Sequence, residues 1–125
     1  MYSILIIDDE PIVKIALRSI LPWEEHGFSI CGTASNGLEA MSLIEKHQPD
    51  VIITDLKMPE MDGLEATRTI RNLDREDCKK IPIYAMSANA FDEDVKRSLA
   101  SGMNGHLSKP VNLQVLEKTL QKVLG

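Results

Sequence analysis

Ile4-Leu5-Ile6-Ile7-Asp8-Asp9 decides the fold, because an unbroken run of large apolar side chains ends directly in two carboxylates. Polar landmarks of the same kind follow along the chain: Asp55 after Val51–Ile53, Ser87 after Ile83–Met86, and Lys109 before Pro110. Near-continuous apolar runs of this length are typical of parallel strands that are buried on both faces. Because the chemistry of open α/β sheets gathers beyond the carboxyl ends of the strands, we expect these polar side chains to converge.

Apolar runs of strand length alternate with helical periodicity along the whole chain. The expected strands cover residues 4–7, 29–34, 51–54, 81–86 and 105–107. Each is followed by apolar residues at helical spacing. Five such units predict an α/β fold, a parallel, doubly wound sheet of five strands with right-handed crossovers and five helices.

Residue types that favour helix ends mark several of the predicted helices. Asn36 and Asp62 are typical N-cap residues, and Gly102 is the residue type that commonly ends a helix. The spacing also predicts core-facing residues, which are Ile12, Ile15, Ala16, Ser19 and Ile20 in the first helix and Phe91, Val95 and Leu99 in the fourth. We expect the charged segment 74–80 to be a loop.

The composition limits the class of protein. The 125 residues predict a single domain, residues 1–125, with one core. A net charge of -5 argues against direct contact with nucleic acid, whose phosphates require a basic face. No apolar run suits a signal peptide or a membrane span, so no membrane contact is expected. Cys31 and Cys78 lack metal or disulfide spacing, which predicts reduced thiols and a cytoplasmic location.

The converging side chains have the composition of a site for a divalent cation and a phosphoryl group. Mg²⁺ is commonly held by one or two carboxylates together with phosphate. Asp9 and Asp55 could supply these ligands, and Asp8 could act through water or at longer range. A carboxylate can also attack phosphorus and form an aspartyl phosphate. The Lys109 ammonium and the Ser87 hydroxyl would then bind phosphoryl oxygens.

Each of these side chains also has an ordinary structural explanation. Asp8 and Asp9 could be a helix cap beside a solvated acid, and Ser87 belongs to a common class of turn residues. Lys109 could lie along the surface of the sheet. Three carboxylates pressed together without a cation would nevertheless repel one another. The occurrence of all these residues at strand ends therefore favours a functional site.

Four motifs in the chain occur together in one known family. They are Ile7–Pro11, Asp55–Gly63, Met86–Ala90 and Leu107–Pro110. With them, essentially the whole chain resembles the receiver domain of bacterial two-component response regulators. The resemblance implies a flavodoxin-like sheet with strand order 2-1-3-4-5. It also implies that Asp55 is the phosphoacceptor and that Mg²⁺ is bound by Asp8, Asp9, Asp55 and the backbone carbonyl of Lys57.

The same resemblance implies how the site is used. Ser87 and Lys109 contact the phosphoryl oxygens, and the bond between Lys109 and Pro110 is cis. The phosphoryl donor is a histidine kinase or a histidine phosphotransfer protein. A receiver catalyses its own phosphorylation and dephosphorylation and is otherwise no enzyme. Phosphorylation switches its conformation and so controls an output partner or an appended domain.

The chain departs from the family pattern at the switch position, where His106 replaces the usual Tyr or Phe. In the family this ring turns inward as the residue equivalent to Ser87 moves toward the phosphoryl group. Burial of imidazole nitrogens without hydrogen-bond partners costs free energy. Lys57 and Asn89 occupy two further positions that modulate the phosphoryl lifetime, and we expect Lys57 to hinder the attacking water.

Two segments resemble different branches of the family. Residues 21–28 resemble an insertion in receivers attached to DNA-binding domains of the arabinose-regulator type. Residues 88–110 resemble receivers of hybrid histidine kinases. The sequence therefore leaves open an appended DNA-binding domain, an appended kinase domain or a stand-alone receiver, and it leaves phosphorylation-dependent dimerisation open as well.

Two other classes of protein share parts of this pattern. A phosphatase of the haloacid-dehalogenase type also uses an aspartyl phosphate and Mg²⁺, but it needs a second acid where this chain has Lys57. A flavin-binding electron carrier needs a Ser/Thr-rich phosphate loop where this chain has Asp8-Asp9-Glu10. Both classes fit the residues less well than a receiver does.

Overall fold

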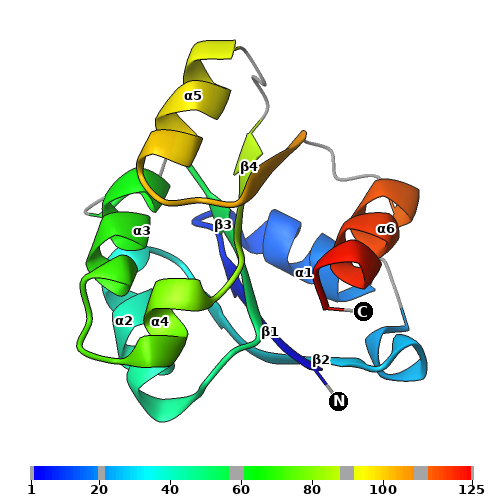
Figure 1. The fold of residues 1–125 in the computed structure, drawn as a ribbon. Coiled ribbons are helices and arrows are strands. Elements are labelled where there is room, and N and C mark those ends of the chain that lie inside the picture. Colours follow the sequence, from blue (N-terminus) through cyan, green and yellow to red (C-terminus); the bar gives the residue numbers. More distant parts are fainter. Residues whose placement is uncertain (1, 20–21, 57–60, 88–91, 109–112, 125) are drawn as a thin grey trace.

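The computed structural model describes residues 2–19, 22–56, 61–87, 92–108 and 113–124. Each strand is followed by one or two helices (Figure 1). In chain order the elements are β1 (Tyr2–Ile7), α1 (Pro11–Ser19), the 3₁₀ helix η1 (Trp23–His26), β2 (Phe28–Ala34), α2 (Gly37–Lys46), β3 (Val51–Asp55), α3 (Gly63–Arg71), α4 (Glu76–Lys80), β4 (Ile83–Ser87), α5 (Asp92–Ala100), β5 (Gly105–Ser108) and α6 (Leu113–Leu124).

The strands form one parallel sheet. Its order is β2-β1-β3-β4-β5, so the flavodoxin-like order 2-1-3-4-5 is confirmed. β1 pairs with both β2 and β3, which places the first strand inside the sheet, second from one edge. The order reverses there, which is the topological position where open α/β sheets place their sites.

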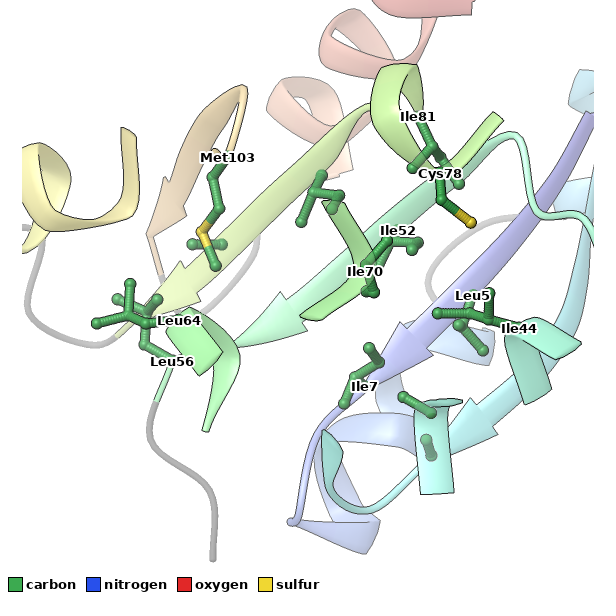
Figure 2. Packing of buried hydrophobic residues seen from close by; sticks show 14 residues of the cluster. Leu5, Ile7, Ile44, Ile52, Leu56, Leu64, Ile70, Cys78, Ile81 and Met103 are labelled. Carbon is green, nitrogen blue, oxygen red and sulfur yellow. The ribbon is translucent and has the colours of Figure 1, made fainter. Parts of the chain in front are cut away.

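The sheet is covered on both faces, as its continuous apolar strands require. Alternate residues of β1 contribute to two separate clusters, Leu5 and Ile7 to one, and Ile4 and Ile6 to the other. In Figure 1, α1 and α6 cover one face, and α2 and α3 lie on the other. Figure 2 shows the second of these layers, where Ile44 of α2 lies beside Leu5 of the sheet.

The prediction of five helices is wrong by one, because α4 occupies part of the expected loop 74–80. Cys78 of α4 is buried in the core rather than exposed in a loop. The Arg75 guanidinium donates to the Ile44 carbonyl at 2.7 Å and pairs with the Asp77 carboxylate. Cys78 is the one apolar residue of α4, so the segment shows no helical periodicity of apolar residues. The sequence therefore showed no sign of a helix that is held by these tertiary contacts.

The predicted inner face of the first helix is also wrong. Ile12 and Ile15 are 78% and 65% exposed, whereas Leu17 is buried and Val13 packs against the core. Two apolar stripes run along this helix, and tertiary packing selects the stripe with Val13 and Leu17. Similarly, Leu99 of α5 is 51% exposed.

The predicted helix ends are confirmed. The Asn36 side chain accepts a hydrogen bond from the Glu39 N–H, and Asp62 accepts one from the Glu65 N–H, each at 2.8 Å. Gly102 follows α5 with φ +107°, a conformation that glycine adopts without steric cost. The last strand, expected at 105–107, is β5.

Candidate functional site

The carboxyl ends of β1, β3 and β4 bring three of the predicted site residues to one edge of the sheet. Ile7 pairs with Thr54, so Asp8 and Asp55 each lie one residue further along neighbouring strands. Asp55 in turn pairs with Met86, the residue before Ser87. Asp8 is fully buried, Asp55 is 7% exposed and Ser87 is half-buried. The strand register therefore brings these three residues to the same edge of the sheet.

A group of carboxylates lies just beyond β1. Oxygen atoms of Asp8, Asp9 and Glu10 all lie within 4.8 Å of one another. Asp8 Oδ1 accepts the Glu10 N–H at 2.9 Å, which turns the chain so that the buried acid and the two exposed acids face the same region. Among the described residues Asp55 lies outside this group, at the end of the adjacent strand. Hard oxygen ligands in this arrangement fit a cation such as Mg²⁺.

Glu10 is a residue that the sequence analysis did not select as a candidate ligand. The feature of the sequence that could have identified Glu10 is its position directly after Asp8 and Asp9. Lys14 was not selected either, although its ammonium donates to Ser35 Oγ at 2.6 Å on the neighbouring loop. Ser35 follows Ala34, whose carbonyl accepts the Asp8 N–H, so this lysine lies near the rim of the acidic group.

The main chain around Asp55 is tightly fixed. Thr54 Oγ1 donates to the Asp55 carbonyl at 3.0 Å, and the Leu56 N–H donates to the Met86 carbonyl at 3.3 Å. The Gly63 N–H donates to the Leu56 carbonyl at 3.0 Å, which joins the first residue of α3 to the residue that follows β3. This hydrogen bond holds the first turn of α3 against the end of the strand that carries Asp55.

Four predicted features fall on residues outside the described ranges. Lys57, Asn89, Lys109 and the Lys109–Pro110 bond lie within 57–60, 88–91 and 109–112. The residue before Lys109 is described: Ser108 pairs with Ser87 across β4 and β5.

His106 lies on β5, two residues before the end of that strand at Ser108. It pairs with Ala85, two residues before Ser87 on β4. Paired residues of parallel strands face the same side of the sheet, and residues two apart on one strand do so as well. His106 and Ser87 therefore share a face, the one that the cluster with Ala85, Ile83 and Ile7 covers.

The response regulator receiver domain model matches residues 4–121, which include every described element of the acidic edge. The chain belongs to the response regulator receiver domain family. It is therefore a receiver domain of two-component signal transduction, and such domains occur in both response regulators and histidine kinases.

Curated relatives of both kinds match this receiver domain. The chain is 39% identical to the sensor histidine kinase RcsC of Salmonella typhimurium over 94% of its length, which is 12% of that kinase. It is 35% identical to the transcriptional regulatory protein HptR of Staphylococcus aureus over 99% of its length, which is 47% of that regulator. The chain thus spans about half or less of these relatives.

Solved receiver structures have the same fold. The chemotaxis response regulator CheY4 of Vibrio cholerae matches with a TM-score of 0.86 and 33% identity over 99% of both chains. The receiver of the Pseudomonas aeruginosa histidine kinase PA1611, which has a magnesium ion coordinated in its active-site cleft, matches with a TM-score of 0.83 and 31% identity over 98% of this chain and 96% of that one.

A third structure shows a receiver together with a partner. The receiver domain of Ssk1 from Saccharomyces cerevisiae was solved in complex with the histidine phosphotransfer protein Ypd1. It matches with a TM-score of 0.84 and 31% identity, over 98% of this chain and 88% of that one.

No helix within the described ranges is long and apolar enough to cross a membrane.

Proposed function

We propose that this receiver accepts a phosphoryl group on Asp55 and passes on a signal through the change that follows. One observation carries this assignment: Asp55 ends a buried strand between Asp8 on one side and Ser87 on the other. Asp8 is less suited to be the acceptor, because it is fully buried and one of its oxygens accepts the Glu10 N–H.

Asp8, Asp9 and Asp55, together with the backbone carbonyl of Lys57, would hold Mg²⁺. The grouped oxygens of Asp8, Asp9 and Glu10 support this proposal, as does the magnesium ion in the PA1611 receiver. When bound, the cation offsets the negative charge of the phosphoryl oxygens. Ser87 and Lys109 would contact the remaining oxygens, the first by its hydroxyl and the second by its ammonium.

The proposed transfer is an exchange of bonds at phosphorus. An oxygen of Asp55 bonds to phosphorus while the bond from phosphorus to the donor's histidine nitrogen breaks, and this nitrogen keeps the electron pair. Later a water oxygen bonds to phosphorus, the bond to Asp55 breaks and inorganic phosphate leaves. The receiver thus returns to its starting state, catalysing its own modification and demodification and no other reaction.

The phosphoryl donor we propose is a histidine kinase or a histidine phosphotransfer protein in the cytoplasm. The Ypd1–Ssk1 complex supports this class of partner. The exposed stripe of Ile12 and Ile15 lies on α1, which begins directly after the acidic group, so a docked donor could reach Asp55 from this side. Output through an appended DNA-binding or kinase domain is consistent with the two kinds of relative.

Three further residues would adjust the signal. His106 shares a face with Ser87 and is the proposed switch residue, which links the phosphoryl group to the surface around β5. Lys57 and Asn89 would set the phosphoryl lifetime. Lys57 stands where a phosphatase of the haloacid-dehalogenase type needs its second acid, which argues for one modification rather than repeated turnover.

The test is incubation of the chain with acetyl phosphate and Mg²⁺, followed by intact-mass measurement. The unmodified sequence should gain one phosphoryl group and lose it slowly, whereas Asp55→Asn should gain none. Asp50→Asn is a matched control, because Asp50 precedes the opposite end of β3 and its carboxylate accepts the Ser3 N–H at 2.8 Å. Modification that persists in Asp55→Asn, or continuous release of phosphate without a modified form, would overturn the proposal.

A further inference from the structure

We propose that Ser35 keeps the Lys14 ammonium away from Glu10 and thereby raises the affinity of the acidic group for a divalent cation. The acidic group is Asp8, Asp9 and Glu10, whose carboxylate oxygens lie within 4.8 Å of one another. This inference rests on the proposed cation site. Ser35 and Lys14 are positioning residues in it, since they act on the site through charge and touch no cation.

The register of the sheet places Ser35 at the edge that carries the acidic group. Ile7 of β1 pairs with Ala34 of β2, so Asp8 and Ser35 are the next residues of two neighbouring parallel strands. The Asp8 N–H donates to the Ala34 carbonyl at 2.9 Å, which continues this pairing beyond β1. On the other side of Ser35, Asn36 caps α2. The main chain on both sides of Ser35 is therefore held in place.

Lys14 reaches Ser35 from α1. Its ammonium donates to Ser35 Oγ at 2.6 Å, and both side chains are half-buried. The Lys14 N–H donates to the Glu10 carbonyl at 3.3 Å, so these two residues are one helical turn apart. The helix that carries Lys14 thus begins directly after the acidic group, and the contact with Ser35 joins this helix to the loop between β2 and α2.

A second partner for the Lys14 ammonium lies one turn earlier on the same helix. A glutamate four residues before a lysine is the favourable order for an ion pair on a helix surface, so local sequence favours a pair between Glu10 and Lys14. The structure shows a different arrangement. Lys14 contacts Ser35, and the Glu10 carboxylate lies with Asp8 and Asp9. The hydroxyl of Ser35 and the carboxylate of Glu10 therefore compete for one ammonium, and Ser35 holds it.

This competition matters for cation binding because an ammonium paired with Glu10 would bring a positive charge into the acidic group. A divalent cation would then bind only after this ion pair had been broken, or against the repulsion of the ammonium. Ser35 supplies a neutral acceptor, which leaves all three carboxylates to the cation. The effect is electrostatic and close to the surface, so it should weaken as the ionic strength rises.

The central experiment is calorimetric titration of the metal-free chain with Mg²⁺. Ser35→Ala should bind Mg²⁺ about threefold more weakly at low ionic strength, and the difference should shrink at high ionic strength. Lys14→Met keeps an unbranched side chain without its charge and should bind Mg²⁺ at least as tightly as the unmodified chain. The double variant should bind like Lys14→Met alone, because no ammonium remains to pair with Glu10. Loss of a purely structural contact at Ser35 would instead persist in the double variant.

Two controls keep the change specific. Ser29→Ala alters a half-buried serine near the opposite end of the same strand, and it should bind Mg²⁺ like the unmodified chain. Ser35→Thr keeps the hydroxyl and should do the same.

The role of Glu10 has its own test. When Glu10→Gln is already present, adding Ser35→Ala should cause no further loss of Mg²⁺ affinity, because no carboxylate then stands four residues before Lys14. A readout without metal is the crystal structure of metal-free Ser35→Ala. It should place the Lys14 ammonium within hydrogen-bond distance of the Glu10 carboxylate.

The outcomes separate this inference from the proposed function. If the unmodified chain binds Mg²⁺ and is modified on Asp55, but Ser35→Ala keeps the original affinity, the inference is wrong and the function stands. The same holds if the double variant binds as weakly as Ser35→Ala, if Ser35→Ala weakens binding further in the presence of Glu10→Gln, or if the ammonium stays away from Glu10 in metal-free Ser35→Ala. If the unmodified chain binds no Mg²⁺, the proposed site fails and this inference fails with it.

Discussion

The carbonyl oxygen of Asp55 lies against Gly63 so closely that a β-carbon at position 63 would overlap it. The same glycine donates its N–H to the Leu56 carbonyl. The first turn of α3 is therefore in direct contact with the main chain of the proposed phosphoacceptor. Any side chain at position 63 must separate the helix from the strand.

Gly63→Ala should accordingly destabilise the chain and slow its phosphorylation. Overpacking of a buried position costs about 1–3 kcal/mol, and here the crowded atoms belong to the backbone and have little freedom to move. Urea unfolding monitored by circular dichroism measures the first effect, and intact mass after acetyl phosphate treatment measures the second. Glu65→Ala, on the exposed side of the same helical turn, should change stability by less than about 0.5 kcal/mol. Equal effects of the two variants would contradict this interpretation.

The exposed isoleucines of α1 should matter for the protein donor and not for the fold. Ile12→Ser combined with Ile15→Ser changes side chains that are 78% and 65% exposed, so the unfolding free energy should stay within about 0.5 kcal/mol of the original. Transfer from a phosphorylated histidine phosphotransfer protein should slow at least several-fold, while modification by acetyl phosphate should not change. Leu38→Ser alters a comparably exposed residue of α2 and serves as the control. A loss of acetyl phosphate reactivity would instead indicate damage to the site.

Arg71 should be a major source of stability for the α3 side of the sheet. Its guanidinium donates to the carbonyls of Gly102 and Cys78 and to Asn104 Oδ1, at distances between 2.9 and 3.1 Å. Burial lowers the pKa of this guanidinium, which nevertheless stays charged. Lysine cannot reproduce the planar set of donors, so Arg71→Lys should cost about 1–3 kcal/mol of unfolding free energy in urea. Arg68→Lys, on the exposed surface of the same helix, should be neutral.

The buried thiol of Cys78 should make stability depend on alkaline pH. Burial raises the pKa of Cys78 above its ordinary value of 9.0. The unfolded chain therefore releases this proton at lower pH than the folded chain does, so stability is complete below about pH 9 and falls as the pH rises further. Urea midpoints between about pH 7.5 and about pH 9.5 should decline less steeply in Cys78→Ala. Both chains should carry Cys31→Ala, because burial also raises the pKa of Cys31.

Patterns that depend on neighbouring residues were readable from the sequence. The apolar runs before Asp8, Asp55 and Ser87 identified buried parallel strands, and the caps at Asn36 and Asp62 identified two helix starts. These predictions succeed because strand burial and helix capping each depend on a few neighbouring residues, so one short segment of sequence is enough to identify them.

Features that depend on contacts between distant parts of the chain could not be predicted from the sequence. The two apolar stripes of α1 look alike in the sequence, and only packing against Leu116 and Leu120 of α6, in the cluster that contains Leu17, turns Ile12 outward. Helix α4 was missed because its stability comes from Arg71 and Arg75, whose acceptors lie far along the chain or in another element.

The sequence by itself determined the parallel α/β sheet, the strand ends that carry the acids and the family to which the chain belongs. Only the tertiary structure decided which face of α1 is exposed, that Glu10 joins the acidic group, and that Gly63 lies directly against the Asp55 carbonyl. The physical reason is the distance in sequence over which each feature is determined. Local patterns follow from backbone geometry and burial within one element, whereas close approaches between elements arise only when the whole core packs.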